Sequence, residues 1–207
     1  MNDADERMRR ISAIVLAGGE SLRMGSNKAL LDYRGQPLWR HLHDVLTQAG
    51  CGQVLISGTL PDLRAGEETI PDITPGLGPL AGIAAVIASQ KEALSARWIL
   101  VVPVDLPLLT PAAVRQLCLQ GAGEPGFPAN SAHYANHALP ALFRNTAAFR
   151  RALTTLLGAT CARARSVTAL HTLLGAQVLP LPEELAPALT NTNTPEDWAS
   201  ICLPANN

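Results

Sequence analysis

The chain has 207 residues, of which 47% are hydrophobic and 16% charged, a composition typical of a compact globular protein rather than a disordered chain. Sixteen Lys and Arg against seventeen Asp and Glu leave a net charge of −1, so the overall charge gives no basis for binding nucleic acid or an anionic membrane. The length fits one domain, and we expect a flexible N-terminal tail at residues 1–10 and the domain itself at residues 11–207.

The cysteines indicate a reducing environment. They form no C-x-x-C pair and have no histidine at ligand spacing, so we expect buried thiols rather than a metal site or a disulfide framework. The four are Cys51, Cys118, Cys161 and Cys202. The polar start of the chain and the short apolar run after it match neither a signal peptide nor a membrane span. We therefore expect a cytoplasmic protein.

The first predicted element is a buried strand at residues 11–16, which runs directly into a glycine-rich loop. The loop contains Gly18, Gly19 and Gly25, and its basic residues are Arg23 and Lys28. Glycine lets a polyphosphate approach backbone N–H groups closely, and fixed positive charge favours the same ligand. The loop therefore predicts a cradle for a nucleoside triphosphate, with an ordinary strand-to-helix turn as the alternative. Its spacing matches neither G-x-x-x-x-G-K-[ST] nor G-x-G-x-x-G.

Helices and strands alternate over the following hundred residues. Apolar periodicity predicts helices at residues 38–50, 83–93 and 111–120, the last with Thr110 as its N-cap. Short apolar runs predict strands at residues 54–56, 69–70 and 98–102. This order predicts an α/β fold, a single Rossmann-like three-layer domain with a mostly parallel central sheet.

The C-terminal part of the chain is less regular. We predict strands at residues 139–143 and 177–181 and helices at residues 146–157 and 167–174. A last helix begins with Thr194 as N-cap, Pro195 at the first position and Asp197 at the capping-box position. We expect this part to form an insertion over the carboxyl edge of the sheet.

Asp105 is the candidate metal ligand. It follows the central apolar strand at residues 98–102 and lies between Pro103 and Pro107. Chemistry on a nucleoside triphosphate commonly uses a hard divalent cation, and Mg²⁺ binds through one or two carboxylates together with substrate phosphates and water. Asp105 therefore predicts a site for Mg²⁺ or Mn²⁺, and a purely structural role in the turn is the alternative.

A second carboxylate and a second glycine-rich turn follow the strand at residues 69–70. Asp72 could face the same cleft, although an Asp in such a loop is equally often structural. In the turn from Gly78 to Gly82, small residues could let a base or ribose lie against the backbone, and close packing of the following helix is the alternative.

These segments together resemble the molybdenum cofactor guanylyltransferase family of the Rossmann-like nucleotidyltransferase superfamily. The resemblance is carried by residues 16–28, Asp72, residues 78–82, residues 103–107 and residues 191–196. It implies transfer of GMP from GTP to the terminal phosphate of molybdopterin, with release of pyrophosphate. The acceptor phosphate is already an anionic nucleophile, so no general base is required, and positioning and charge neutralisation would supply the catalysis.

The resemblance also assigns roles to individual residues. The backbone of Leu16, Ala17, Gly18 and Gly19 would hold the nucleotide together with Ser57, Asp72 and Gly78. Lys28, Arg23 and Asp105 would be the catalytic residues, with Asp105 contacting both metal and nucleotide. Asn191 and Asn193 would lie near the acceptor, although Asn also commonly stabilises loops. Arg163 and Arg165 could hold the acceptor phosphate or could be solvated surface charges.

Three positions depart from the family pattern. Asn27 stands where an acidic residue usually precedes the lysine, Ser57 where a nucleotide-contacting Asn is common, and Leu139 where a His often precedes the proline. The departures leave two alternatives open: a cytidylyltransferase or sugar-phosphate nucleotidyltransferase of the same fold, and a non-catalytic nucleotide- or pterin-binding protein. The expected partners are GTP and molybdopterin, with transient contact to proteins that handle the cofactor and no binding to nucleic acid or membrane.

Overall fold

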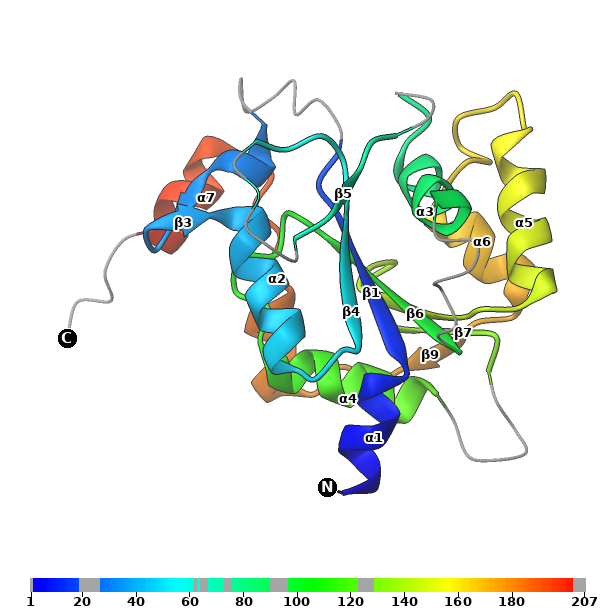
Figure 1. Ribbon diagram of the computed structural model, residues 1–207, viewed down its shortest axis with the longest axis horizontal. Coiled ribbons are helices and arrows are strands. Elements are labelled where there is room, and N and C mark those ends of the chain that lie inside the picture. The colour runs from blue at the N-terminus through cyan, green and yellow to red at the C-terminus, as the bar shows by residue number, and fades with distance from the viewer. Residues whose placement is uncertain are drawn as a thin grey trace.

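The computed structural model describes residues 2–18, 27–61, 63, 67–72, 76–89, 97–122 and 129–202, and within them a seven-stranded sheet runs through the molecule (Figure 1). The strand order is β5-β4-β1-β6-β8-β7-β9. Neighbouring strands run parallel except at β8, which is antiparallel to both of its neighbours. The strands are β1 (Ile11–Leu16), β4 (Gln53–Ser57), β5 (Thr69–Ile70), β6 (Trp98–Pro103), β7 (Ser131–Tyr134), β8 (Ala141–Arg144) and β9 (Gln177–Leu179). The predicted α/β fold with a mostly parallel sheet is confirmed.

Helices cover both faces of the sheet and divide the core into two layers (Figure 1). One face carries α1 (Asp3–Arg9), α2 (Leu38–Gln48) and α4 (Pro111–Gly121). The other face carries α3 (Pro79–Ser89), α5 (Ala147–Leu157) and α6 (Val167–Leu174). Side chains of β1 alternate between the layers, because successive residues of a strand point to opposite faces. A strand buried on both faces must be apolar throughout, which explains the continuous apolar run of β6.

Side-chain caps set the starts of three helices. Thr110, Thr146 and Ser166 each accept a hydrogen bond from the backbone N–H three residues further on, at the first turns of α4, α5 and α6. The helix predicted at residues 83–93 begins earlier, at Pro79, and its described part ends at Ser89. Apolar periodicity predicts the starts of α4, α5 and α6 to within one residue of their observed positions.

The C-terminal part of the chain does not form the expected insertion over the carboxyl edge. Instead, β8, β7 and β9 extend the sheet beyond β6. The free edge of β6 carries backbone N–H and C=O groups that need partners, and β8 supplies them in antiparallel register. The chain then returns through η2 (Glu183–Leu189) to α7 (Pro195–Cys202), which lies beside β3 on the opposite side of the molecule from α5 (Figure 1).

The expected N-terminal tail is also corrected. Helix α1 occupies most of it, and Met8 is completely buried in the core. The Arg7 guanidinium donates to the carbonyl of Leu119 at 2.9 Å, and Arg115 donates to the Asp5 carboxylate at 2.8 Å. Both contacts join α1 to α4. The two helices are far apart in the sequence, so no local pattern predicts that α1 packs against the domain.

Several smaller features were missing from the sequence prediction. These are η1 (Lys28–Leu30), η2, the hairpin of β2 (Asp32–Tyr33) and β3 (Gln36–Pro37), and strand β7. Among the cysteines whose side chains are described, Cys118 is buried and Cys51 half-buried, but Cys161 is exposed, contrary to expectation. No helix in the described part of the chain has the length and apolar character needed to cross a membrane.

His171 of α6 is a polar group inside the second core layer. Its side chain is buried against the Phe143 ring, with ring centroids 5.2 Å apart. Nε2 lies 3.0 Å from the carbonyl oxygen of Ala138, and Nδ1 lies 3.3 Å from the Ser131 hydroxyl oxygen. A neutral ring satisfies both contacts by donating from Nε2 and accepting at Nδ1. Burial lowers the pKa of His171 to about 4.

We predict that replacing Met8 by Ala lowers the free energy of unfolding by about 2–4 kcal/mol, because it removes a fully buried side chain and leaves a cavity. Urea denaturation measures the change. Leu173→Ala on the exposed face of α6 is the control and should cost less than about 0.5 kcal/mol. Equal stability of Met8→Ala and the parent would show that α1 does not pack onto the domain.

We also predict that stability falls as the pH drops from about 6.5 to about 4, by at most about 3 kcal/mol from His171. In this window the unfolded chain binds a proton at His171 and the folded protein does not, so protonation favours unfolding. Denaturation curves at several pH values measure the slope. His171→Leu should be less stable overall but should show a smaller slope, and an unchanged slope would contradict the assignment.

Candidate active site

The predicted site residues converge at the carboxyl edge of the parallel strands. Gly18 lies just beyond β1, Ser57 ends β4, Asp72 follows β5 and Asp105 follows β6. The register places Leu16 beside Ser57 on one side and beside Pro103 on the other. Hydrogen bonds join these strand ends, from the Ala17 N–H to the Ser57 carbonyl at 2.9 Å and from the Val104 N–H to the Leu16 carbonyl at 3.2 Å. Ligands of open α/β sheets bind at this edge.

Ser57 and Asp72 form one unit beside the glycine loop. The Ser57 hydroxyl donates to Asp72 Oδ1 at 2.9 Å, and the Ser57 side chain is almost completely buried. The other carboxylate oxygen of Asp72 lies only 3.0 Å from the position that a Cβ on Gly18 would occupy. A Cβ on Gly82 of α3 would overlap Ser57 Oγ. The described contacts of Gly82 therefore fit the close-packing alternative.

Asp105 follows β6 and is half-buried, but one of its carboxylate oxygens is completely buried. Its Oδ1 atom has no hydrogen-bond partner among the described residues. Burial raises the pKa of Asp105, although the positive charge of Lys28 acts in the opposite direction. A buried carboxylate oxygen without a donor is suited to a hard cation. No group of three His, Cys, Asp or Glu side chains in the described ranges is placed to hold a metal.

Lys28 is held from the far end of the chain. Its ammonium donates to the Thr192 carbonyl at 2.7 Å and to the Asn193 side-chain oxygen at 2.9 Å. Thr192 is buried, and its own N–H donates to the Asp105 carbonyl at 2.9 Å. The segment around Thr192 thus contacts two of the candidate catalytic residues, Lys28 and Asp105. Sequence reasoning missed Thr192, because these contacts use mainly its backbone and carry no residue signature.

The capping box of α7 stabilises this segment and is confirmed. Asp197 accepts hydrogen bonds from the N–H groups of Asn193 and Thr194, both at 2.9 Å. Thr194 Oγ1 accepts from the Asp197 N–H at 3.1 Å. The hydrogen bonds from Asn193 and Thr194 lower the pKa of Asp197. The box therefore fixes the turn that carries Asn193 against Lys28.

The remaining predicted residues have less specific surroundings. Asn191 and Arg163 are exposed, whereas Arg165 donates to the carbonyls of Ala159 at 2.7 Å and Thr160 at 3.4 Å. The Arg165 carbonyl lies 4.0 Å from the position of a Cβ on Gly78, so the loop before α6 approaches the second glycine turn. Asn27 caps η1 by accepting from the Ala29 N–H at 3.0 Å. Gly19 and Arg23 lie outside the described residues.

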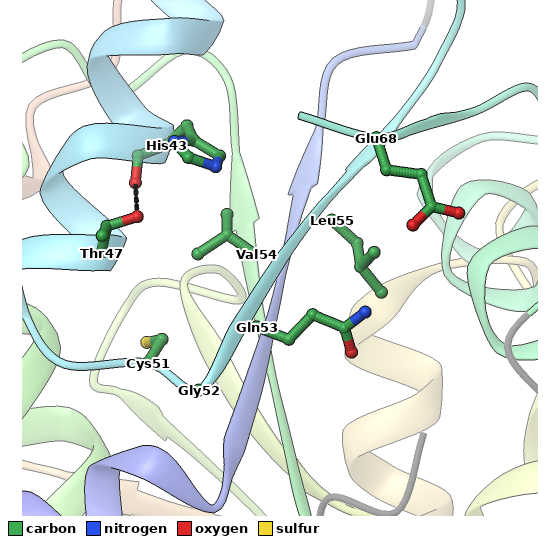
Figure 2. A pocket seen from close by; sticks show the side chains of 8 residues that line it. All are labelled: His43, Thr47, Cys51, Gly52, Gln53, Val54, Leu55 and Glu68. Atoms are coloured by element: carbon green, nitrogen blue, oxygen red, sulfur yellow. Dashed lines mark hydrogen bonds between the residues drawn. The ribbon is translucent and has the colours of Figure 1, made fainter. Parts of the chain in front are cut away.

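Two cavities lie away from this edge. One, of about 270 Å³, runs along β4 toward its amino-terminal end and is lined by α2 residues such as His43 and by Glu68 (Figure 2). The other, of about 450 Å³, lies between α6, β9 and the turn after β7 and includes His133 and His171. None of the predicted site residues lines either cavity. The candidate site is therefore identified by the residues at the strand ends and not by either cavity.

A mostly parallel sheet that brings a carboxylate with a buried oxygen, a lysine and the start of a glycine-rich loop to its carboxyl edge is typical of a nucleotide-handling α/β enzyme. Residues 13–176 match the family model of the MobA-like NTP transferase domain. The chain belongs to this family and is an enzyme of the nucleotidyltransferase type.

Individual relatives agree with the family assignment. The chain is 40% identical over 195 residues to the molybdenum cofactor guanylyltransferase of Xanthomonas euvesicatoria, covering 92% of this chain and 93% of the relative. It is 34% identical to a probable molybdenum cofactor guanylyltransferase of Opitutus terrae, with 90% and 92% covered. The crystal structure of a molybdopterin-guanine dinucleotide biosynthesis protein A from Archaeoglobus fulgidus matches the fold with a TM-score of 0.70 at 19% identity, covering 92% of this chain and 96% of that chain.

We predict that Asp105→Asn leaves the thermal midpoint of the ligand-free protein unchanged or raises it at pH 7–8. Burial disfavours the charged carboxylate, as the raised pKa shows, and the neutral amide removes this penalty while keeping the size. Calorimetry measures the midpoint, and Asp44→Asn on α2 is the control for removing a half-exposed charge. A drop of several degrees in Asp105→Asn alone would show that the carboxylate is structural.

Proposed function

We propose that the protein transfers GMP from GTP to the terminal phosphate of molybdopterin and releases pyrophosphate. The observation that carries the proposal is the convergence of two groups at the edge where the glycine loop follows β1: the Lys28 ammonium and the Asp105 oxygen that has no hydrogen-bond partner among the described residues. Two relatives match nearly the whole chain, and they are named as a molybdenum cofactor guanylyltransferase and a probable one. Their names support the choice of nucleotide and acceptor.

In the proposed reaction an oxygen of the acceptor phosphate attacks the α-phosphorus of GTP. A new P–O bond forms there, and the bond between the α-phosphorus and the oxygen leading to the β-phosphate breaks. Pyrophosphate leaves with the bonding electron pair. Because the nucleophile is already anionic, no side chain has to remove a proton, and catalysis depends on alignment and charge neutralisation.

Lys28 would neutralise charge on the triphosphate. An ammonium group has three N–H donors, and the described residues engage two of them, at Thr192 and Asn193. The third can therefore donate to a phosphate oxygen while the first two hold the side chain in place. This arrangement reduces the entropy that Lys28 would lose on binding the nucleotide.

Asp105 would hold a Mg²⁺ or Mn²⁺ ion through its buried oxygen. When bound, such an ion supplies electrostatic stabilisation of the negative charge on the phosphates. Asp72, Gly78 and the backbone at residues 16–19 would bind the nucleotide, with Ser57 behind the Asp72 carboxylate. Arg23 would neutralise charge on the phosphates. Asn191, Asn193, Arg163 and Arg165 would face the acceptor, and the product would pass to proteins that handle the cofactor.

The test is pyrophosphate release from each of the four nucleoside triphosphates, with and without molybdopterin, in the presence of Mg²⁺. We expect release only with GTP and the acceptor together. Asp105→Asn and Lys28→Ala should each lower kcat by about a hundredfold or more, because each removes charge stabilisation from the transition state. Arg151→Ala, an exposed charge on α5, is the control and should behave like the parent.

Other outcomes identify the alternatives. Preference for CTP would make the protein a cytidylyltransferase, and use of a sugar phosphate instead of molybdopterin would assign a different acceptor. Binding of GTP without release of pyrophosphate under any of these conditions would favour a non-catalytic nucleotide-binding protein.

A further inference from the structure

Ser57 is predicted from the family resemblance to contact the nucleotide, but its surroundings make a direct contact difficult. Only 1% of the residue is accessible to solvent. A serine hydroxyl has one O–H to donate, and Ser57 donates it to Asp72 Oδ1. The Ser57 carbonyl is also occupied, since it accepts from the N–H of Ala17. Ser57 therefore has no accessible donor with which to reach a ligand.

Asp72, in contrast, is partly exposed and has an oxygen facing the loop. Its Oδ2 atom lies 3.0 Å from the position that a Cβ on Gly18 would occupy, whereas Oδ1 lies 3.5 Å from that position. The hydrogen bond from Ser57 to Oδ1 sets the rotation of the carboxylate, and this rotation presents Oδ2 above the start of the glycine loop. A free carboxylate side chain would sample several rotations.

We propose that Ser57 is a positioning residue that acts on the nucleotide through Asp72, by fixing the carboxylate so that Oδ2 accepts a hydrogen bond from the bound nucleotide. This inference rests on the proposed function in one respect, namely that the nucleotide lies over the loop after β1. An ionised carboxylate only accepts hydrogen bonds. The group it meets must be an N–H of the base or an O–H of the ribose, and not a phosphate.

Gly82 is part of the same arrangement. A Cβ at this position would overlap Ser57 Oγ and would lie 3.2 Å from Asp72 Oδ1. A side chain on α3 at this point would displace the Ser57 hydroxyl and with it the carboxylate. The absence of a side chain at Gly82 therefore makes room for the contact between Ser57 and Asp72.

The experiment is a mutant cycle read by calorimetric titration with GTP. Ser57→Ala should weaken GTP binding by roughly tenfold, the scale of one lost hydrogen bond to a charged group. Because Ser57 acts through Asp72, adding Ser57→Ala to Asp72→Ala should cause no further loss. Equal losses from Ser57→Ala in the two backgrounds, or no loss in either, would overturn the proposal.

A second pair of variants tests the role of Gly82. Gly82→Ala should weaken GTP binding in the parent, because the new Cβ overlaps the Ser57 hydroxyl. In the Ser57→Ala background that hydroxyl is gone, so Gly82→Ala should have a much smaller effect. An equally large effect of Gly82→Ala in both backgrounds would contradict the arrangement.

Inorganic tripolyphosphate separates this role from general damage to the loop. Ser57→Ala should not change its affinity, since Asp72 is proposed to meet the base or the ribose. Equal weakening of tripolyphosphate and GTP would overturn the proposal. With 2′,3′-dideoxy-GTP, a persistent effect of Ser57→Ala assigns the hydrogen-bond donor to the base and a lost effect assigns it to the ribose, and both results support the proposal.

Two controls keep the result interpretable. Ser131→Ala removes a hydroxyl that is equally buried, at the amino-terminal start of β7, and should leave the dissociation constant of GTP unchanged. Ser57→Cys keeps the size of the side chain and replaces a good donor by a weak one, so it should fold if Ser57→Ala does not and should bind GTP with intermediate affinity.

The outcomes also separate this inference from the proposed function. If the parent transfers GMP but Ser57→Ala binds GTP normally, the positioning role fails and the function stands. If the mutant cycle holds but no triphosphate releases pyrophosphate with molybdopterin, the proposed reaction fails and the role of Ser57 in nucleotide binding stands.

Discussion

The position of β1 between β4 and β6 is the constraint on which the site depends. Both pairings are parallel, and the register sets Leu16 opposite Ser57 and Pro103. The three strands therefore end at the same level of the sheet, and the residues that follow them meet at one edge. The apolar side chains of β1 enter both core layers, so a shift of register by one residue would exchange its two faces and disrupt the packing of both layers.

Two charged side chains at this edge, Asp105 and Lys28, differ in how well their hydrogen-bonding groups are satisfied. One oxygen of Asp105 is buried and has no hydrogen-bond partner among the described residues, and burial raises the pKa of the carboxyl group. Burying a carboxylate oxygen without a donor costs free energy in the ligand-free protein. Lys28, by comparison, is well satisfied, since Thr192 and Asn193 hold its ammonium. The site thus combines an unsatisfied carboxylate with a positioned cation.

The return of the chain to this edge explains why the C-terminal region matters for the site. Three of its strands add to the far side of the sheet, and only then does the segment around Thr192 cross back to Asp105. The capping box of α7 fixes this segment through Asp197. A region that looks irregular in sequence therefore makes two contributions: it completes the sheet, and it holds the candidate catalytic lysine.

The sequence by itself determined the fold class, the α-helices after α1, the strand before the glycine loop and the identity of the candidate residues. These features depend on local patterns: apolar periodicity, caps and motif spacing. Only the tertiary structure decided that α1 packs through Met8, that β8 pairs antiparallel with β6, and that Ser57 points its hydroxyl at Asp72. Each of these features joins residues that are distant in the chain, and the pairing of β8 with β6 uses backbone groups that every residue carries. Contacts of these kinds leave no local pattern in a single sequence.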